Sequence, residues 1–140
     1  MGVFKDASEL YLAIGGLFEK ARTHRAMGET LRKSGLIIRF NYSNPESSLT
    51  IDARNPAAEG EYFTVYRGAT DVKPDIEMAM EAGVAHQFWL QKLSLTAALA
   101  RGQMKLKGPL PQILKLLPVI KPAYQMYPEH LKEAGLGHLI

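Results

Sequence analysis

The side chains that could carry catalytic or metal chemistry are scattered along this sequence. The four histidines, His24, His86, His130 and His138, form no HExxH or HxxxH pair on a helix face. No serine lies in a G-x-S-x-G motif, and a chain without cysteine has no thiolate for a zinc site, an iron–sulfur cluster or a nucleophile. We therefore expect no enzymatic activity, no metal and no cofactor.

One group of carboxylates has a spacing that acid–base catalysis could use. Glu77 and Glu81 lie on the polar side of an expected strand, and Asp75 begins that strand. Two carboxylates on one strand face could serve as acid and base. A solvated strand face explains the same pattern more simply, and we favour that interpretation.

Basic residues gather around an apolar segment in the second half of the chain. Arg101, Lys105 and Lys107 precede this segment, which itself contains Lys115 and ends at Lys121. A basic stripe beside an apolar helix could contact an anionic membrane surface for a short time. The same lysines could instead keep an edge strand soluble. The aromatic residues are not interleaved with the basic ones, so we expect no nucleic-acid partner.

The composition is that of an ordinary globular domain. The chain has 140 residues, of which 46% are apolar and 22% charged, and its net charge is +3. This length fits a single domain, residues 1–140, that buries about two-thirds of its unfolded surface. The start lacks the apolar run of a secretory signal, and no run of about 18 apolar residues is present. We therefore expect a cytoplasmic protein.

Hydrophobic periodicity divides the chain into the helices and strands of an α+β fold. Apolar residues at three- and four-residue steps predict a helix from Ala7 to Ala21. Alternating apolar and polar residues predict strands at 36–42, 49–54, 61–67, 76–81 and 104–107. The first three strands should be antiparallel, because their connections are too short for crossovers. Further helices are expected at 85–92, 95–101, 109–120 and 128–134.

The apolar segment from Leu110 to Ile120 needs cover on all sides. It is apolar nearly all round the expected helix, so the tail after residue 121, a second subunit or an apolar ligand must cover it. Methionines at inward strand positions adapt to variable apolar shapes. Inward apolar residues are therefore the candidate ligand contacts. They are Ile38, Phe40, Ile51, Met78, Met80, Phe88, Trp89, Met104, Leu106, Ile113, Leu114, Leu117, Ile120 and Tyr124.

The order of these elements resembles the sterol carrier protein 2 (SCP2) sterol-binding domain family. The most specific stretch runs from Ala100 to Gly108, reads ARGQMKLKG and is followed at once by the apolar helix. It is similar to the family's strand before its closing helix, and Asp75 to Met78 is similar to the preceding strand. The resemblance covers residues 6–121 and leaves 122–140 as a C-terminal extension.

This resemblance implies a mixed five-stranded sheet packed with helices around an apolar ligand tunnel. It also implies non-catalytic binding or transfer of a sterol, fatty acid, acyl-CoA or similar lipid. Among the basic residues, Arg101, Lys105, Lys107 and Lys115 are our candidates to meet a carboxylate at the mouth. The alternative function is a dimerisation or accessory module for a lipid-modifying enzyme, in which a homodimer buries the same surface. The extension could be a lid, part of the core or a partner surface.

Overall fold

One mixed sheet of five strands organises the computed structural model, which describes residues 2–55 and 58–140. The strand order is β3-β2-β1-β4-β5. The central pair, β1 and β4, is parallel, and the other neighbours are antiparallel. The bounds are β1 Ile37–Ser43, β2 Ser47–Asp52, β3 Thr64–Arg67, β4 Ile76–Glu81 and β5 Met104–Lys107. The antiparallel arrangement expected for the first three strands is confirmed.

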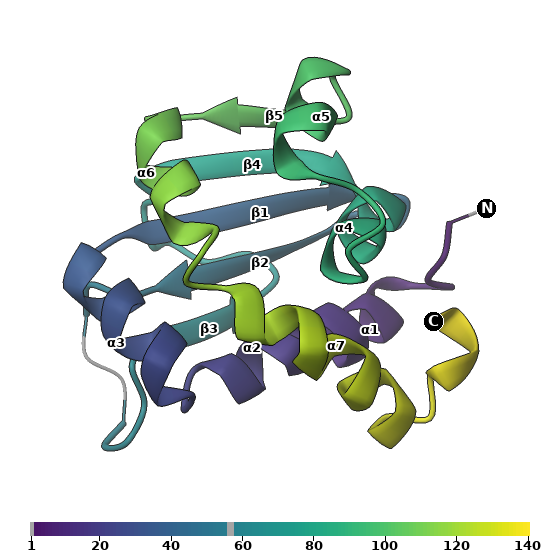
Figure 1. Ribbon diagram of the computed structural model, residues 1–140, viewed down its shortest axis with the longest axis horizontal. Coiled ribbons are helices and arrows are strands. Elements are labelled where there is room, and N and C mark those ends of the chain that lie inside the picture. The colour runs from purple at the N-terminus through teal and green to yellow at the C-terminus, as the bar shows by residue number, and fades with distance from the viewer. Residues whose placement is uncertain (1, 56–57) are drawn as a thin grey trace.

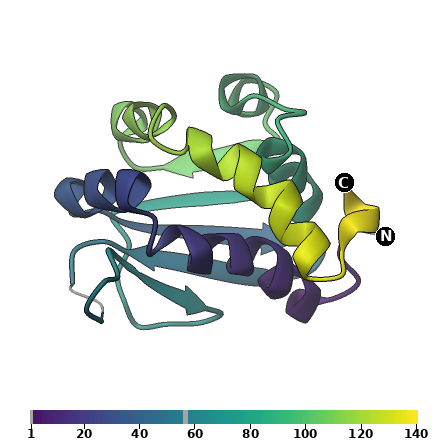
Figure 2. The ribbon, with the colours of Figure 1, turned by 60° about the horizontal axis from the view of Figure 1, so that its bottom comes forward.

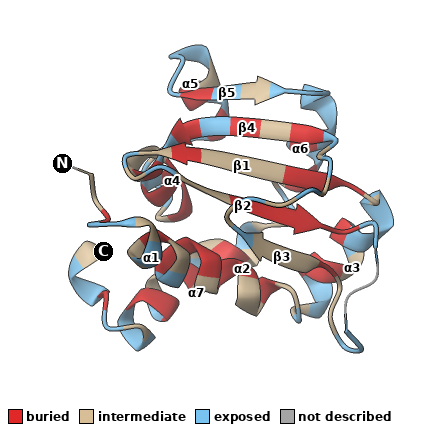
Figure 3. Ribbon diagram, turned by 180° about the vertical axis from the view of Figure 1, so that it is seen from behind, coloured by how far each residue is buried: buried red, intermediate tan, exposed pale blue. Residues whose placement is uncertain are grey.

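The helices gather on one face of this sheet (Figures 1 and 2). Seen from behind, β1, β2, β4 and β5 have no described helix in front of them (Figure 3). The helical elements are α1 Ala7–Leu10, the π-helical turn η1 Tyr11–Gly15, α2 Gly16–Ala21, α3 Arg25–Ser34, α4 Ala82–Trp89, α5 Leu95–Ala100, α6 Leu110–Leu116, α7 Lys121–Glu133 and the short 3-10 helix η2 Gly137–Leu139. Within the described residues, no helix is long and apolar enough to cross a bilayer.

Alternation along the strands separates a buried face from a polar one. Phe40 of β1 lies opposite Leu49 of β2 and Met78 of β4, and all three side chains face the helices. On the other face, the Arg39 guanidinium donates to Thr50 Oγ1 at 3.1 Å and to the carbonyl of Val72, and so holds the loop before β4 against the sheet.

The first helix begins where the sequence predicts. The Asp6 side chain accepts a hydrogen bond from the backbone N–H of Glu9 at 2.9 Å, and the helical path continues through η1 to Ala21. Helix α3 was not predicted, because the sequence pattern indicates no element for residues 25–34. Only Met27 and Leu31 supply large buried apolar side chains there, which is too few to establish a helical period.

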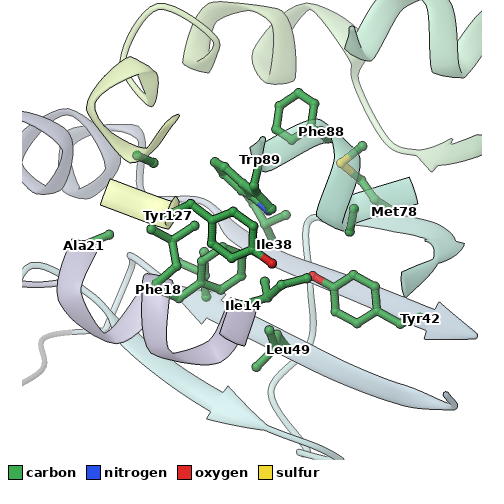
Figure 4. Packing of buried hydrophobic residues seen from close by; sticks show 14 of the residues in the cluster. Ile14, Phe18, Ala21, Ile38, Tyr42, Leu49, Met78, Phe88, Trp89 and Tyr127 are labelled. Carbon is green, nitrogen blue, oxygen red and sulfur yellow. The ribbon is translucent and has the colours of Figure 1, made fainter. Parts of the chain in front are cut away.

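Helix α7 is longer than expected and belongs to the core. It begins at Lys121 instead of residue 128 and continues through Pro128. Burial of Tyr127 and Leu131, which are both fully buried, compensates for the hydrogen bond that proline cannot donate. Figure 4 shows Tyr127 among Ile14, Phe18 and Ile38. Residues 122–140 therefore complete the packing.

Candidate functional site

An apolar cavity lies between the inner face of the sheet and the helices. Its volume is about 100 Å³, and strands β1, β2, β4 and β5 form its floor. Helices α2, α3, α4, α5 and α6 supply its walls. The lining residues are Phe18, Leu31, Ile38, Phe40, Tyr42, Ile51, Met78, Met80, Ala85, Phe88, Trp89, Leu95, Met104, Ile113, Leu116, Leu117 and Ile120. A lining without charged side chains suits an apolar ligand.

Most of the candidate ligand contacts meet at this cavity. Eleven of the 14 line it: Ile38, Phe40, Ile51, Met78, Met80, Phe88, Trp89, Met104, Ile113, Leu117 and Ile120. They come from separate strands and helices, so only the fold brings them together.

Three candidates lie elsewhere. Leu106 is half-buried on the edge strand β5, and Leu114 is exposed because one residue along a helix turns about 100° away from Ile113. Tyr124 packs on the far side of two lining aromatics, with its ring centroid 5.7 Å from that of Phe88 and 6.2 Å from that of Trp89.

Six lining residues were not among the candidates. They are Phe18, Leu31, Tyr42, Ala85, Leu95 and Leu116. The sequence could have identified Phe18 and Tyr42, since each lies on the apolar face of a predicted helix or strand. Nothing in the sequence pattern indicated Leu31, because helix α3, which contains it, was not predicted.

Aromatic rings form one wall of the cavity. Trp89 meets Phe88 and Phe18 edge to face, with ring centroids 5.0 Å and 5.8 Å apart. Phe40 and Tyr42 stack on the sheet side, with centroids 6.4 Å apart. Figure 4 shows Trp89 and Phe88 from α4 above the strand that carries Ile38. Such rings hold their positions through their neighbours, whereas Met78 and Met80 can change rotamer to suit a guest.

A groove adjoins the cavity between the α4–α5 connection and the α6–α7 junction. Phe88, Leu95 and Leu117 line both the groove and the cavity. Lys121 and Tyr124 also line the groove. The basic residues expected at a mouth, Arg101, Lys105, Lys107 and Lys115, line neither the cavity nor this groove. Of the basic residues named here, Lys121 is therefore the one whose groove adjoins the cavity.

Two of the three carboxylates considered for acid–base catalysis, Asp75 and Glu77, have structural partners. Asp75 accepts a hydrogen bond from the backbone N–H of Ile37 at 2.9 Å and pairs with the Arg54 guanidinium, which lowers the Asp75 pKa. Glu77 lies 3.9 Å from the Arg39 guanidinium on the face of the sheet away from the cavity. The solvated-face interpretation fits this arrangement.

Two buried histidines tie helices together. His86 of α4 has Nδ1 2.7 Å from the Tyr127 hydroxyl and Nε2 2.7 Å from the Leu139 carbonyl oxygen, so Nε2–H donates to that carbonyl and Nδ1 accepts from the hydroxyl. Burial lowers the pKa of His86, and the hydrogen bond to the Leu139 carbonyl offsets part of this shift. His130 of α7 lies with Nε2 2.7 Å from the carbonyl oxygen of Leu12 in η1. Both histidines therefore fasten α7 and the residues after it.

In residues 2–55 and 58–140, no three histidine or carboxylate side chains converge as a metal site. The arrangement offers an apolar space with an adjoining cation.

A comparison with family models gives one match. The model of the SCP-2 sterol transfer family matches residues 17–121. No curated protein sequence matches the chain.

Solved structures with the same fold are distant in sequence. Apo sterol carrier protein 2 from Yarrowia lipolytica has a TM-score of 0.58 and 20% identity, covering 82% of this chain and 88% of that one. Sterol carrier protein domain 2 of Helicoverpa armigera has a TM-score of 0.56 and 22% identity, covering 69% and 76%. The sec-alkylsulfatase Pisa1 from a Pseudomonas species has a TM-score of 0.54 and 17% identity over 66% of this chain, which spans 14% of that enzyme's length. The expected α+β, SCP2-like fold is confirmed.

Proposed function

The chain belongs to the SCP-2 sterol transfer family, whose members generally bind or transfer lipids, and we propose that it is a non-catalytic carrier of a single-chain lipid such as a fatty acid. The cavity carries this proposal: its lining is apolar side chains from every strand but β3. Each methylene transferred from water into such a space contributes about 0.8 kcal/mol. A long acyl chain needs no polar contact to be retained.

A lipid tail must enlarge the cavity to enter it. The volume of about 100 Å³ lies below the range of about 300 to 1,000 Å³ of ligand pockets. Helix α6 is the element best placed to move. It is seven residues long, lies between Gly108 at φ 129° and Pro118, and covers the cavity with Ile113 and Leu116. We expect α6 to shift outward when a chain enters.

The groove beside the cavity suits the headgroup. A carboxylate there would meet the ammonium of Lys121 and the hydroxyl of Tyr124, while its acyl chain passes Phe88 and Leu117 into the cavity. An ammonium and a hydroxyl both donate to a carboxylate. This geometry favours a fatty acid over a neutral sterol.

Trp89 allows a direct test, because it is the only tryptophan and lines the cavity. Delipidated protein titrated with palmitate should show a saturable change in Trp89 emission, and native mass spectrometry should show one palmitate per chain. Ala85→Leu, which fills the cavity, should weaken binding at least tenfold, whereas Ala79→Leu on the exposed face of β4 should not. Circular dichroism checks that both variants fold. No palmitate adduct with the unmodified protein would refute the carrier function.

The match to a segment of a larger enzyme favours one second candidate, an accessory or dimerisation module. Such a module would be an empty, tight dimer in native mass spectrometry. A monomer with bound lipid supports the carrier instead.

A further inference from the structure

The charges of this chain are strongly segregated. Residues 82–128 contain six basic side chains and no aspartate or glutamate. The whole chain has 17 basic and 14 acidic residues, so the rest of it, with 11 and 14, carries a net charge of −3. The mildly basic total hides one positive segment on an otherwise acidic protein.

The fold presents much of this segment over the cavity. It comprises α4, α5, β5, α6 and the first part of α7, and Figure 2 shows α5 and α6 on the side of the molecule away from the sheet. Lys92, Arg101, Lys115 and Lys121 are exposed in or beside these helices. Lys105 and Lys107 differ, because they lie opposite Ala79 and Glu77 in the β4–β5 register and so belong to the helix-free face of the sheet.

Two large apolar side chains of the same segment are exposed on α6. Leu110 is 39% exposed and Leu114 is 37% exposed. They lie one turn apart on α6, on the side turned away from the cavity that Ile113 and Leu116 line. Nothing in the described chain covers them.

We propose that this surface, defined by Leu110 and Leu114 of α6 and by the exposed cations Lys92, Arg101, Lys115 and Lys121 of the same segment, docks the protein on an anionic phospholipid membrane. A bilayer surface offers phosphate and carboxylate charges together with acyl chains just beneath them. A second copy of this chain fits poorly, because a symmetric contact would place the cations of both copies together. The proposal extends the carrier function, since docking would set the movable helix α6 against the source of lipid.

Vesicle flotation tests this docking with the folded, full-length protein. The protein should float with vesicles of phosphatidylcholine and phosphatidylserine, much less with phosphatidylcholine alone, and less as salt rises. Leu110→Ser with Leu114→Ser should weaken binding at least tenfold. Arg101→Gln with Lys115→Gln should do the same, because each basic residue near an anionic surface is worth about fivefold in affinity.

The matched control removes the same charge from the other face. Lys105→Gln with Lys107→Gln should change vesicle affinity by less than about threefold. Palmitate binding measured without vesicles should stay unchanged in all three double variants, which separates docking from the carrier function. Equal losses of vesicle affinity in the Arg101/Lys115 pair and in the Lys105/Lys107 control pair would overturn the proposal. So would a failure of the unmodified protein to float, or a dimer in sedimentation that depends on Leu110 and Leu114.

Discussion

His86 is held at both of its ring nitrogens, by Tyr127 and by the Leu139 carbonyl. Burial lowers its pKa in the folded protein relative to about 6.5 in the unfolded chain. As the pH falls below about 6.5, the unfolded chain therefore binds the proton first. The stability due to neutral His86 is complete above that pH and is lost as the pH falls toward the folded-state pKa.

We expect His86→Gln to flatten this pH dependence. The free energy of unfolding, measured with denaturant above and below pH 6.5, should fall with acid more steeply in the unmodified protein than in the variant. At neutral pH the variant should be about 1 to 3 kcal/mol less stable, because the Tyr127 hydroxyl or the Leu139 carbonyl loses its buried partner. Carboxylates with lowered pKa, such as Asp75, act only at lower pH. Parallel curves for the two proteins would contradict the assignment.

The crossing of α7 over the first helix depends on one glycine of a pair. At η1 the Gly16 N–H bonds to the Ala13 carbonyl, and the carbonyl of Leu12 accepts from His130 instead. A Cβ on Gly16 would lie 2.1 Å from His130 Nε2, whereas one on Gly15 would make ordinary contacts at 3.5 Å or more. The π-helical turn and the small residue therefore serve the same contact.

Alanine substitutions at Gly15 and Gly16 should distinguish the effect of the contact with His130 from the effect of helix propensity on stability. Gly16→Ala should lower the free energy of unfolding by about 2 kcal/mol or more, because it displaces the buried His130 ring from the Leu12 carbonyl. Gly15→Ala should be neutral or stabilising by up to about 1 kcal/mol, since alanine is the better helix former. Thermal or denaturant unfolding measures both. Similar losses in the two variants would show that the backbone turn, and not the histidine, is sensitive.

Helix α6 has one inward and one outward side, and a pair of substitutions tests its orientation. Leu117→Asp, directly after α6, should cost several kcal/mol or abolish palmitate binding, because the carboxylate would enter the apolar cavity. Lys115→Asp lies in solvent and should change the free energy of unfolding by less than about 1 kcal/mol. Melting temperatures and palmitate titrations report both effects. Equal behaviour of the two variants would contradict this orientation.

Sequence periodicity predicted the elements whose apolar positions are dense. Ile38 and Phe40 alternate with polar neighbours, and Ile76, Met78 and Met80 do the same, so β1 and β4 were located and their inward residues identified. Helix α3 was missed because Met27 and Leu31 alone anchor it. Leu114 was misplaced because α6 is apolar on nearly every side, and composition cannot say which side the cavity takes. The contact between Gly16 and His130 joins residues far apart in sequence, and no local pattern reveals it.

At the scale of the whole molecule, the residues beyond the family match complete the core. The match ends at residue 121, yet Tyr127 and Leu131 are fully buried and Leu136 is nearly so. A chain that ends at residue 122 should lose several kcal/mol and be poorly soluble, because it exposes the surfaces that these side chains cover. A chain that ends at Leu136 loses the Leu139 carbonyl and should still fold.

Circular dichroism and solubility distinguish these truncations. A folded, soluble chain of residues 1–122 with faster palmitate release would mean that the extension acts as a lid instead. Unfolding of both truncations would mean that the short helix η2 matters more than the burial of Tyr127 suggests.

The cavity also affects the response of the protein to hydrostatic pressure. A void of about 100 Å³ per molecule is about 60 mL/mol, within the range of about 20 to 100 mL/mol by which proteins contract on unfolding. Compression therefore favours the unfolded chain as long as the void is unfilled. We expect the delipidated protein to unfold at a lower pressure than the palmitate-bound protein, with Trp89 emission as the readout. Identical midpoints for the two forms would mean that palmitate does not occupy the void, so the volume change of unfolding would report whether the interior of the fold is filled.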